Sequence, residues 1–143
     1  MRGLNMTLIR LVLVALLCPL LGCALLQRGP TDEELLGDLL RGWQAAMDAR
    51  DVDKVMTFYS KDFMSPQGAD YEGMKEALER FVPQFDDYGV KLSSADASIT
   101  IEGDTATIEP ITLEADMGSM TLSLIATKEA PGVWRITNSE MEQ

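Results

Sequence analysis

The feature of this sequence that most limits its fold is a change in hydrophobic period close to residue 90. Upstream of it, apolar residues recur every three or four positions, which is the spacing of one helix face. Downstream of it, β-branched residues become common and apolar residues alternate with polar ones, as is typical of strands with one buried face. Helices followed by a run of antiparallel strands predict an α+β fold.

Three helices are predicted in the upstream half, and each has an identifiable start or end. Thr31 and Glu34 fit a capping box at the start of the first helix, where acidic residues also suit the positive end of the helix dipole. Asp51 is the predicted N-cap of the second helix, and Pro83 should loosen the last turn of the third. The predicted helices cover Asp32–Ala49, Val52–Ser60 and Tyr71–Phe85.

Four antiparallel strands are predicted downstream, with a hairpin turn at Gly103-Asp104. Pro110 interrupts their alternation: Ile108 and Ile111 are separated by an odd number of positions, so a regular strand would place them on opposite faces. A bulge or bend is therefore expected at Pro110. The predicted strands lie at residues 97–101, 106–109, 120–124 and 133–137.

Charge is distributed unevenly along the chain. Residues 1–22 contain two arginines and no acid, so residues 23–143 carry all 23 acids against ten bases, a net charge of −13. Such a surface repels phosphate backbones, and no nucleic-acid partner is expected. The sequence has no histidine and only two cysteines, which leaves no zinc cluster, disulfide framework or histidine acid–base group. No metal or cofactor is therefore expected.

The N-terminus has the order of a secretory signal. Arg2 and Arg10 form a positive region, and an apolar stretch follows from Leu11 to Leu21. This stretch is short for a membrane-spanning helix. We therefore interpret residues 1–22 as a signal peptide, residues 23–30 as a tether and residues 31–143 as the folded domain.

The signal ends in Leu20-Leu21-Gly22-Cys23, which resembles the lipobox of bacterial lipoproteins. A small residue before the cut fits a narrow protease site, and only a thiol can carry a thioether-linked diacylglycerol. The resemblance implies cleavage before Cys23, acylation of that cysteine with chains such as palmitate, and a membrane anchor facing the periplasm. The residue after the cysteine is Ala24 and not aspartate, which is similar to lipoproteins that are sorted to the outer membrane. The alternative is that Cys23 is an ordinary small apolar residue of a signal peptide or anchor helix.

Three stretches of the domain resemble the NTF2-like superfamily, also called SnoaL-like or ketosteroid-isomerase-like. They are the helix–break–helix passage Ala49–Phe63, a glycine-led helix from Tyr71 to Leu78, and a closing strand, Gly132–Ile136, that contains Trp-Arg-Ile. Their order implies a cone in which three N-terminal helices pack on a curved antiparallel sheet of about four strands. Cystatin-like folds are the nearest alternative, but they offer one long helix where this sequence offers three.

The resemblance also implies a pocket for a small apolar ligand at the open end of the cone. The candidate ligand-binding residues, from the helices and the inner sheet face, are Trp43, Met47, Tyr59, Phe63, Phe81, Phe85 and Trp134. The alternative for each is ordinary core packing, since aromatic and methionine side chains at helical spacing usually bury themselves. Trp43 and Tyr59 are the strongest candidates because their polar ends need partners when buried.

No catalytic set is recognised in the sequence. Enzymatic members of the superfamily place an aspartate or histidine opposite a donor such as tyrosine, whereas here Asp51 and Asp53 fit a helix start and Asp62 fits a turn. Glu109 and Glu114 lie on strands, and the face they occupy depends on the expected bend. We therefore expect a non-catalytic envelope lipoprotein that holds a small apolar ligand or self-associates, for instance as a homodimer. The alternative is an enzyme that acts on a small cyclic or lipid-like substrate.

Overall fold

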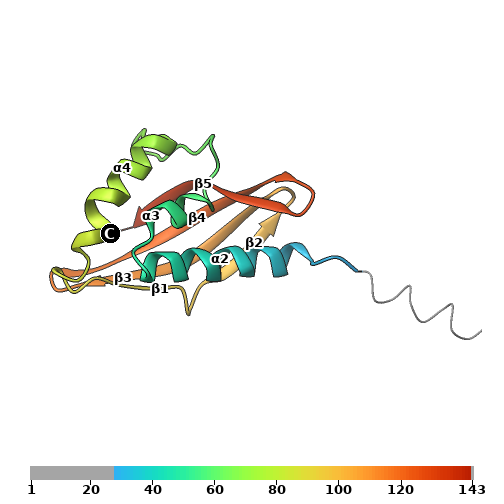
Figure 1. Cartoon of the computed structure of the whole chain (residues 1–143). Coiled ribbons are helices and arrows are strands. Elements are labelled where there is room, and N and C mark those ends of the chain that lie inside the picture. The colour runs from blue at the N-terminus through green and yellow to red at the C-terminus, as the bar shows by residue number, and fades with distance from the viewer. Residues whose placement is uncertain (1–27, 143) are drawn as a thin grey trace, which may run out of the picture. The chain divides into compact units, whose positions relative to one another are not determined.

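The structure is a computed structural model that describes residues 28–142 of the chain (Figure 1). The predicted signal peptide, the lipobox cysteine Cys23 and most of the predicted tether lie outside these residues. In the described part of the chain, no helix is both long and apolar enough to cross a membrane. Residues 31–143 form a compact unit of their own, and this unit contains the hydrophobic core.

The first helix, α2 (Asp32–Asp48), begins with the predicted capping box. The Glu34 backbone N–H donates to Thr31 Oγ1 at 3.2 Å, and the Thr31 backbone N–H donates to Glu34 Oε2 at 2.8 Å. Two backbone donors that the first turn leaves without helical partners are thereby satisfied. The helix buries one stripe of six residues: Leu36, Leu39, Leu40, Trp43, Ala46 and Met47.

The second helix, α3 (Val52–Met56), starts after the predicted cap Asp51 but is shorter than the predicted Val52–Ser60. Its end is set by the sheet. The Ser60 backbone N–H donates to the Ile136 carbonyl oxygen at 2.8 Å, and the Ile136 N–H donates to the carbonyl oxygen of Phe58 at 2.8 Å. These residues pair with the edge of the sheet, and so their backbone groups are not available to a helix.

The third helix, α4 (Tyr71–Phe81), is capped by Asp70 and also ends earlier than predicted. A short 3₁₀ helix, η1 (Val82–Gln84), replaces its predicted last turn. Pro83 lies in η1 and has no backbone N–H to continue the α-helical bonding. The expected loosening at Pro83 is confirmed, and it removes residues 82–85 from the α-helix.

A five-stranded antiparallel sheet forms the second half of the domain. The long strands β3, β4 and β5 lie side by side, while β1 and β2 pair with opposite halves of β3. The strand beyond the four predicted is β1, which at three residues is too short for its alternation to identify a strand. The strands are β1 (Lys91–Ser93), β2 (Ser98–Glu102), β3 (Thr105–Ala115), β4 (Gly118–Ala130) and β5 (Val133–Glu142).

The irregularity expected at Pro110 is present in β3. Ile108 pairs with Leu124 and Ile111 pairs with Leu122, so three steps along β3 match two steps along β4. The extra residue returns both isoleucines to the inner face, where each is fully buried. The bulge therefore keeps the aliphatic face of β3 continuous on both sides of the proline.

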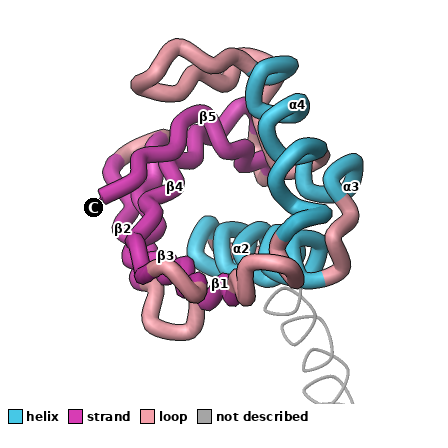
Figure 2. Tube along the Cα trace, turned by 90° about the vertical axis from the view of Figure 1, so that its left-hand side faces the viewer, coloured by secondary structure: helices cyan, strands magenta, loops and turns pink. Residues whose placement is uncertain are grey.

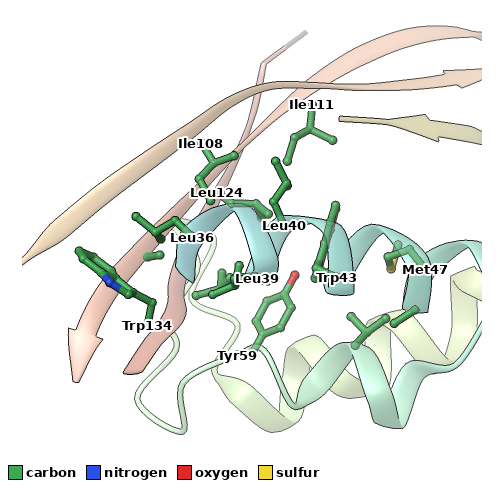
Figure 3. Close-up of a cluster of buried hydrophobic side chains, with 14 of the residues drawn as sticks. Leu36, Leu39, Leu40, Trp43, Met47, Tyr59, Ile108, Ile111, Leu124 and Trp134 are labelled. Atoms are coloured by element: carbon green, nitrogen blue, oxygen red, sulfur yellow. The ribbon is translucent and has the colours of Figure 1, made fainter. Parts of the chain in front are cut away.

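The core lies between α2 and the inner face of the sheet. Figure 2 shows the sheet curving around α2, with α3 and α4 along one side and no helix on the outer face. The buried stripe of α2 meets Ile108, Ile111 and Leu124 from β3 and β4 (Figure 3). Apolar burial of this kind provides most of the favourable free energy of folding.

Candidate functional site

Trp43 and Tyr59 bring two polar groups into the apolar core. Trp43 is 1% exposed, and its Nε1 has no hydrogen-bond partner among the described residues. The Tyr59 hydroxyl points toward Trp43 in Figure 3, and the Phe63 ring packs edge-on against the Tyr59 ring at 5.1 Å. A buried N–H without an acceptor costs about 1–3 kcal/mol, so this position is an exception to normal core packing.

Burial raises the pKa of the Tyr59 hydroxyl to about 12. The nearby Trp43 indole N–H lowers that pKa to a smaller extent, although its geometry falls short of a hydrogen bond. Tyr59 therefore stays protonated at neutral pH. The two side chains place an N–H and an O–H close together, and both can donate to a hydrogen-bond acceptor.

Trp134 lies elsewhere, at the start of α2. Its Nε1 donates to Asp32 Oδ1 at 2.9 Å, and Lys128 Nζ donates to Asp32 Oδ2 at 3.0 Å. The Trp134 hydrogen bond and then Lys128 lower the pKa of Asp32 from its ordinary value of 3.8. The indole of Trp134 is thus fully satisfied, and it ties the first turn of α2 to β4 and β5.

Helix α4 has an apolar face that the structure covers only in part. Tyr71, Met74 and Leu78 are half-buried, Phe81 is 56% exposed, and no residue of α4 is fully buried. The helix rests on α3, where the Tyr71 hydroxyl donates to the Met56 carbonyl oxygen at 3.3 Å. Tyr71, Met74 and Leu78 also pack partly against the core, so the apolar face of α4 is covered in part and Phe81 is left exposed.

Two methionines on the sheet are exposed at the same end of the molecule. Met120 on β4 is 38% exposed and Met141 on β5 is 62% exposed. Met141 pairs with Leu122, which packs partly against the core, so this position belongs to the inner face. Figure 1 places α4, the C-terminus and the β3–β4 turn at one end of the domain. Apolar side chains from two sides therefore remain uncovered there.

The seven candidate residues thus fall into separate environments. Five of them belong to the buried core, where Trp134 lies at the start of α2: Trp43, Met47, Tyr59, Phe63 and Trp134. Phe81 is exposed on α4, and Phe85 is half-buried under the guanidinium group of Arg50 at 5.1 Å. The sequence did not single out Leu78, Met120 or Met141, because spacing indicates which face is apolar but not how completely that face is covered.

No protein-family model matches the sequence, and no curated protein does either. Solved structures do match. A Nostoc punctiforme protein of unknown function with a cystatin-like fold has a TM-score of 0.58 at 19% identity, over 80% of this chain and 94% of that one. An NTF2-like protein from Cytophaga hutchinsonii has a TM-score of 0.57 at 14% identity, over 78% of this chain and 98% of that one.

The fold is NTF2-like.

Bd1075 from Bdellovibrio bacteriovorus has a TM-score of 0.60 at 19% identity over 75% of this chain, but this chain spans only 40% of its length. At such identities the likeness shows the fold alone. The expected α+β fold, with helices packed on a curved antiparallel sheet, is therefore confirmed, and its structural neighbours include both NTF2-like and cystatin-like proteins. The sheet has five strands where about four were expected, and the helices are shorter than expected.

In this NTF2-like fold, the two strand glutamates lie outside the cone. Glu109 is exposed and accepts a hydrogen bond from Ser123 Oγ at 2.7 Å on the outer face. Glu114 is exposed on the same face, opposite Lys91. Both carboxylates point away from the core that contains Tyr59, because their neighbours Ile108 and Leu113 take the inward positions.

Proposed function

We propose that this chain is an envelope lipoprotein whose NTF2-like domain holds a small apolar ligand without transforming it. The observation that carries the proposal is the Trp43 N–H, which is buried beside the Tyr59 hydroxyl and has no acceptor among the described residues. A ligand with an apolar body and one hydrogen-bond acceptor would satisfy this group and remove the cost of leaving it unpaired.

The incomplete cover of α4 supports the same function. Helices in small domains normally bury their apolar stripe, whereas the stripe of α4 is only partly buried, and further exposed methionines lie at the same end of the domain. Methionine side chains are flexible and polarizable, and they suit binding surfaces that adapt to apolar molecules. A ligand inserted at this end would cover apolar area that the chain itself leaves in contact with water.

The absence of catalysis is part of the proposal. The tyrosine that could serve as a donor faces an indole N–H, and the two strand carboxylates that could serve as a base lie on the outer face. A tyrosine and a tryptophan can orient a bound molecule, but neither accepts a proton from it at neutral pH.

The ligand-binding part can be tested with the domain of residues 31–143 and the neutral fluorophore N-phenylnaphthylamine. Leu78→Asn places an amide on the half-buried face of α4, whereas Glu76→Asn places the same amide on its exposed face. We expect saturable binding by the unmodified domain, several-fold weaker binding by Leu78→Asn and unchanged binding by Glu76→Asn. Absence of saturable binding, or equal binding by both variants, would contradict the proposal.

The anchoring part rests on the lipobox sequence and has its own test. The processed chain should carry diacylglycerol on the sulfur of Cys23 and remain with the membrane fraction, and we place it on the periplasmic side of the outer membrane. Cys23→Ala should abolish acyl labelling and membrane retention, while Cys18→Ala should change neither. A labelled and membrane-bound Cys23→Ala variant would refute this route.

A further inference from the structure

The outer face of the sheet contains a hollow that the proposed ligand site does not use. Its volume is about 400 Å³, and it crosses β2, β3, β4 and β5 beside the β3 bulge. It is lined by Ser98, Thr100, Glu109, Pro110, Thr121, Ser123 and Glu142. Apart from the proline, every lining side chain is a hydroxyl or a carboxylate, and no lysine or arginine contributes to it.

Sequence alternation explains why these side chains gather there. On β2, Ser98 and Thr100 are exposed, whereas Ile99 and Ile101 pack against the core. The bulge at Pro110 breaks the regular pairing of β3 in the middle of this face. A local interruption of the ladder thus coincides with the hollow.

Ser123 occupies a position unlike that of its neighbours. It is only 8% exposed, although no helix covers the outer face (Figure 2). Its Oγ donates to Glu109 Oε2 at 2.7 Å, which fixes one carboxylate of the hollow. Glu142 lies on β5, opposite Thr121. One oriented carboxylate and a second on another strand make the hollow a preformed acceptor of hydrogen bonds and positive charge.

We propose that this hollow docks a basic segment of another protein, with lysine or arginine side chains bound by Glu109 and Glu142. Carboxylates accept hydrogen bonds and cannot donate them, so the matching groups are ammonium and guanidinium. The net charge of −13 on residues 23–143 would speed the approach of such a partner.

Two other occupants fit less well. A second copy of this chain would bring carboxylates against carboxylates, because Glu140 also lies on this face, opposite Ser123. A small free cation would contact only part of an open surface hollow and would gain little enclosure. A basic segment can engage Glu109 and Glu142 together and continue along the strands.

The test uses the full chain in a non-ionic detergent and a short peptide of alternating lysine and serine, with titration calorimetry. E109Q/E142Q should weaken peptide binding roughly tenfold, which is within the range that two exposed charge pairs provide. The control E33Q/E76Q removes the same charge from exposed positions on α2 and α4, and it should leave the affinity nearly unchanged. S123A keeps the charge but releases Glu109, and it should weaken binding several-fold.

Four results would overturn the proposal. They are no binding of the lysine peptide, an equal loss in E109Q/E142Q and in the control, spermidine binding as tight as peptide binding, and a dimer of the unmodified chain that E109Q/E142Q strengthens. An equal loss of affinity would show that the peptide responds to the overall negative charge of the domain. Tight spermidine binding would show a site for small cations, and the dimer would show that this face is a contact between copies of the chain. None of these results bears on the apolar ligand site.

Discussion

Helices α2 and α4 have the same kind of amphipathic pattern but are buried to different extents in the fold. Each starts with a side-chain cap, from Thr31 and Asp70 respectively, and each has its apolar residues on one face. Apolar and polar residues are separated onto opposite faces at least as clearly on α4 as on α2. Yet α2 buries six residues, and α4 buries none completely.

The difference lies in what each helix packs against. Helix α2 lies against α3 on one side and against strands β1, β2 and β5 on the other, whereas α4 rests on α3 and continues into η1. An amphipathic pattern therefore indicates which face turns inward, while the cover on that face depends on a second surface. In the proposed function, the incompletely covered apolar face of α4 is the one that contacts the ligand.

The difference in burial between the two helices is tested most strongly by truncating one apolar side chain on each of them. Leu36→Ala removes a fully buried side chain of α2 and should cost about 2–5 kcal/mol in the free energy of unfolding. Phe81→Ala removes a side chain of α4 that is 56% exposed and should cost less than about 1 kcal/mol. Urea unfolding of residues 31–143 measures both, and similar losses would show that α4 is buried as well as α2.

Tyr59, which packs beneath α2, should make the domain sensitive to alkali. Burial raises the pKa of its hydroxyl from 10.0 to about 12. The folded state therefore holds its proton longer than the unfolded state, and stability falls as pH rises between these values, by about 1.4 kcal/mol per pH unit. Tyr59→Phe should remove this dependence. An equally steep alkaline loss in Tyr59→Phe would mean that another group is responsible.

Substitution of the two tryptophans should give smaller changes in stability that differ from each other. Trp43→Phe removes an N–H without an acceptor, and the regained desolvation cost offsets part of the lost packing, so we expect a change within about 1 kcal/mol. Trp134→Phe removes a hydrogen bond to Asp32 and should destabilise the domain more. Thermal unfolding of both variants gives the order, and a larger loss for Trp43→Phe would contradict it.

Substitution of Asp32 should have the smallest effect, and the pH dependence of that effect should lie in the acid range. The pKa of Asp32 is lowered by the Trp134 N–H and by Lys128, so its contribution is present above the unfolded value of 3.8 and is lost as pH falls through the folded pKa. Asp32→Asn should lower the melting temperature at neutral pH, and the gap to the unmodified domain should close below this value. A gap that stays constant into acid would exclude Asp32 as its source.

Local sequence signals predicted the features that depend on neighbouring residues. The capping box at Thr31, the cap at Asp51, the loosening at Pro83 and the bulge beside Pro110 all follow from backbone chemistry within a few positions. The order of helices before strands followed from the change in hydrophobic period. These features require no knowledge of distant contacts.

Features set by distant contacts were missed. Helix α3 ends early because the segment around Ser60 pairs with Ile136, and a separation of this length leaves no local signal. Strand β1 alternates over only three residues, which is too few to distinguish a strand from a loop. The sequence could not show that the Trp43 N–H lacks an acceptor while the Trp134 N–H has one. Each outcome depends on which acceptor the fold brings near the indole.

The most direct test follows the two indole N–H resonances of nitrogen-labelled residues 31–143 by NMR, since the sequence contains only two tryptophans. On addition of a medium-chain methyl ketone, the Trp43 resonance should move to a saturating end point as its N–H gains an acceptor. The Trp134 resonance should stay in place, because its N–H is already held by Asp32. A Trp43 resonance that does not move, or two resonances that move together, would contradict a ligand site beside Tyr59.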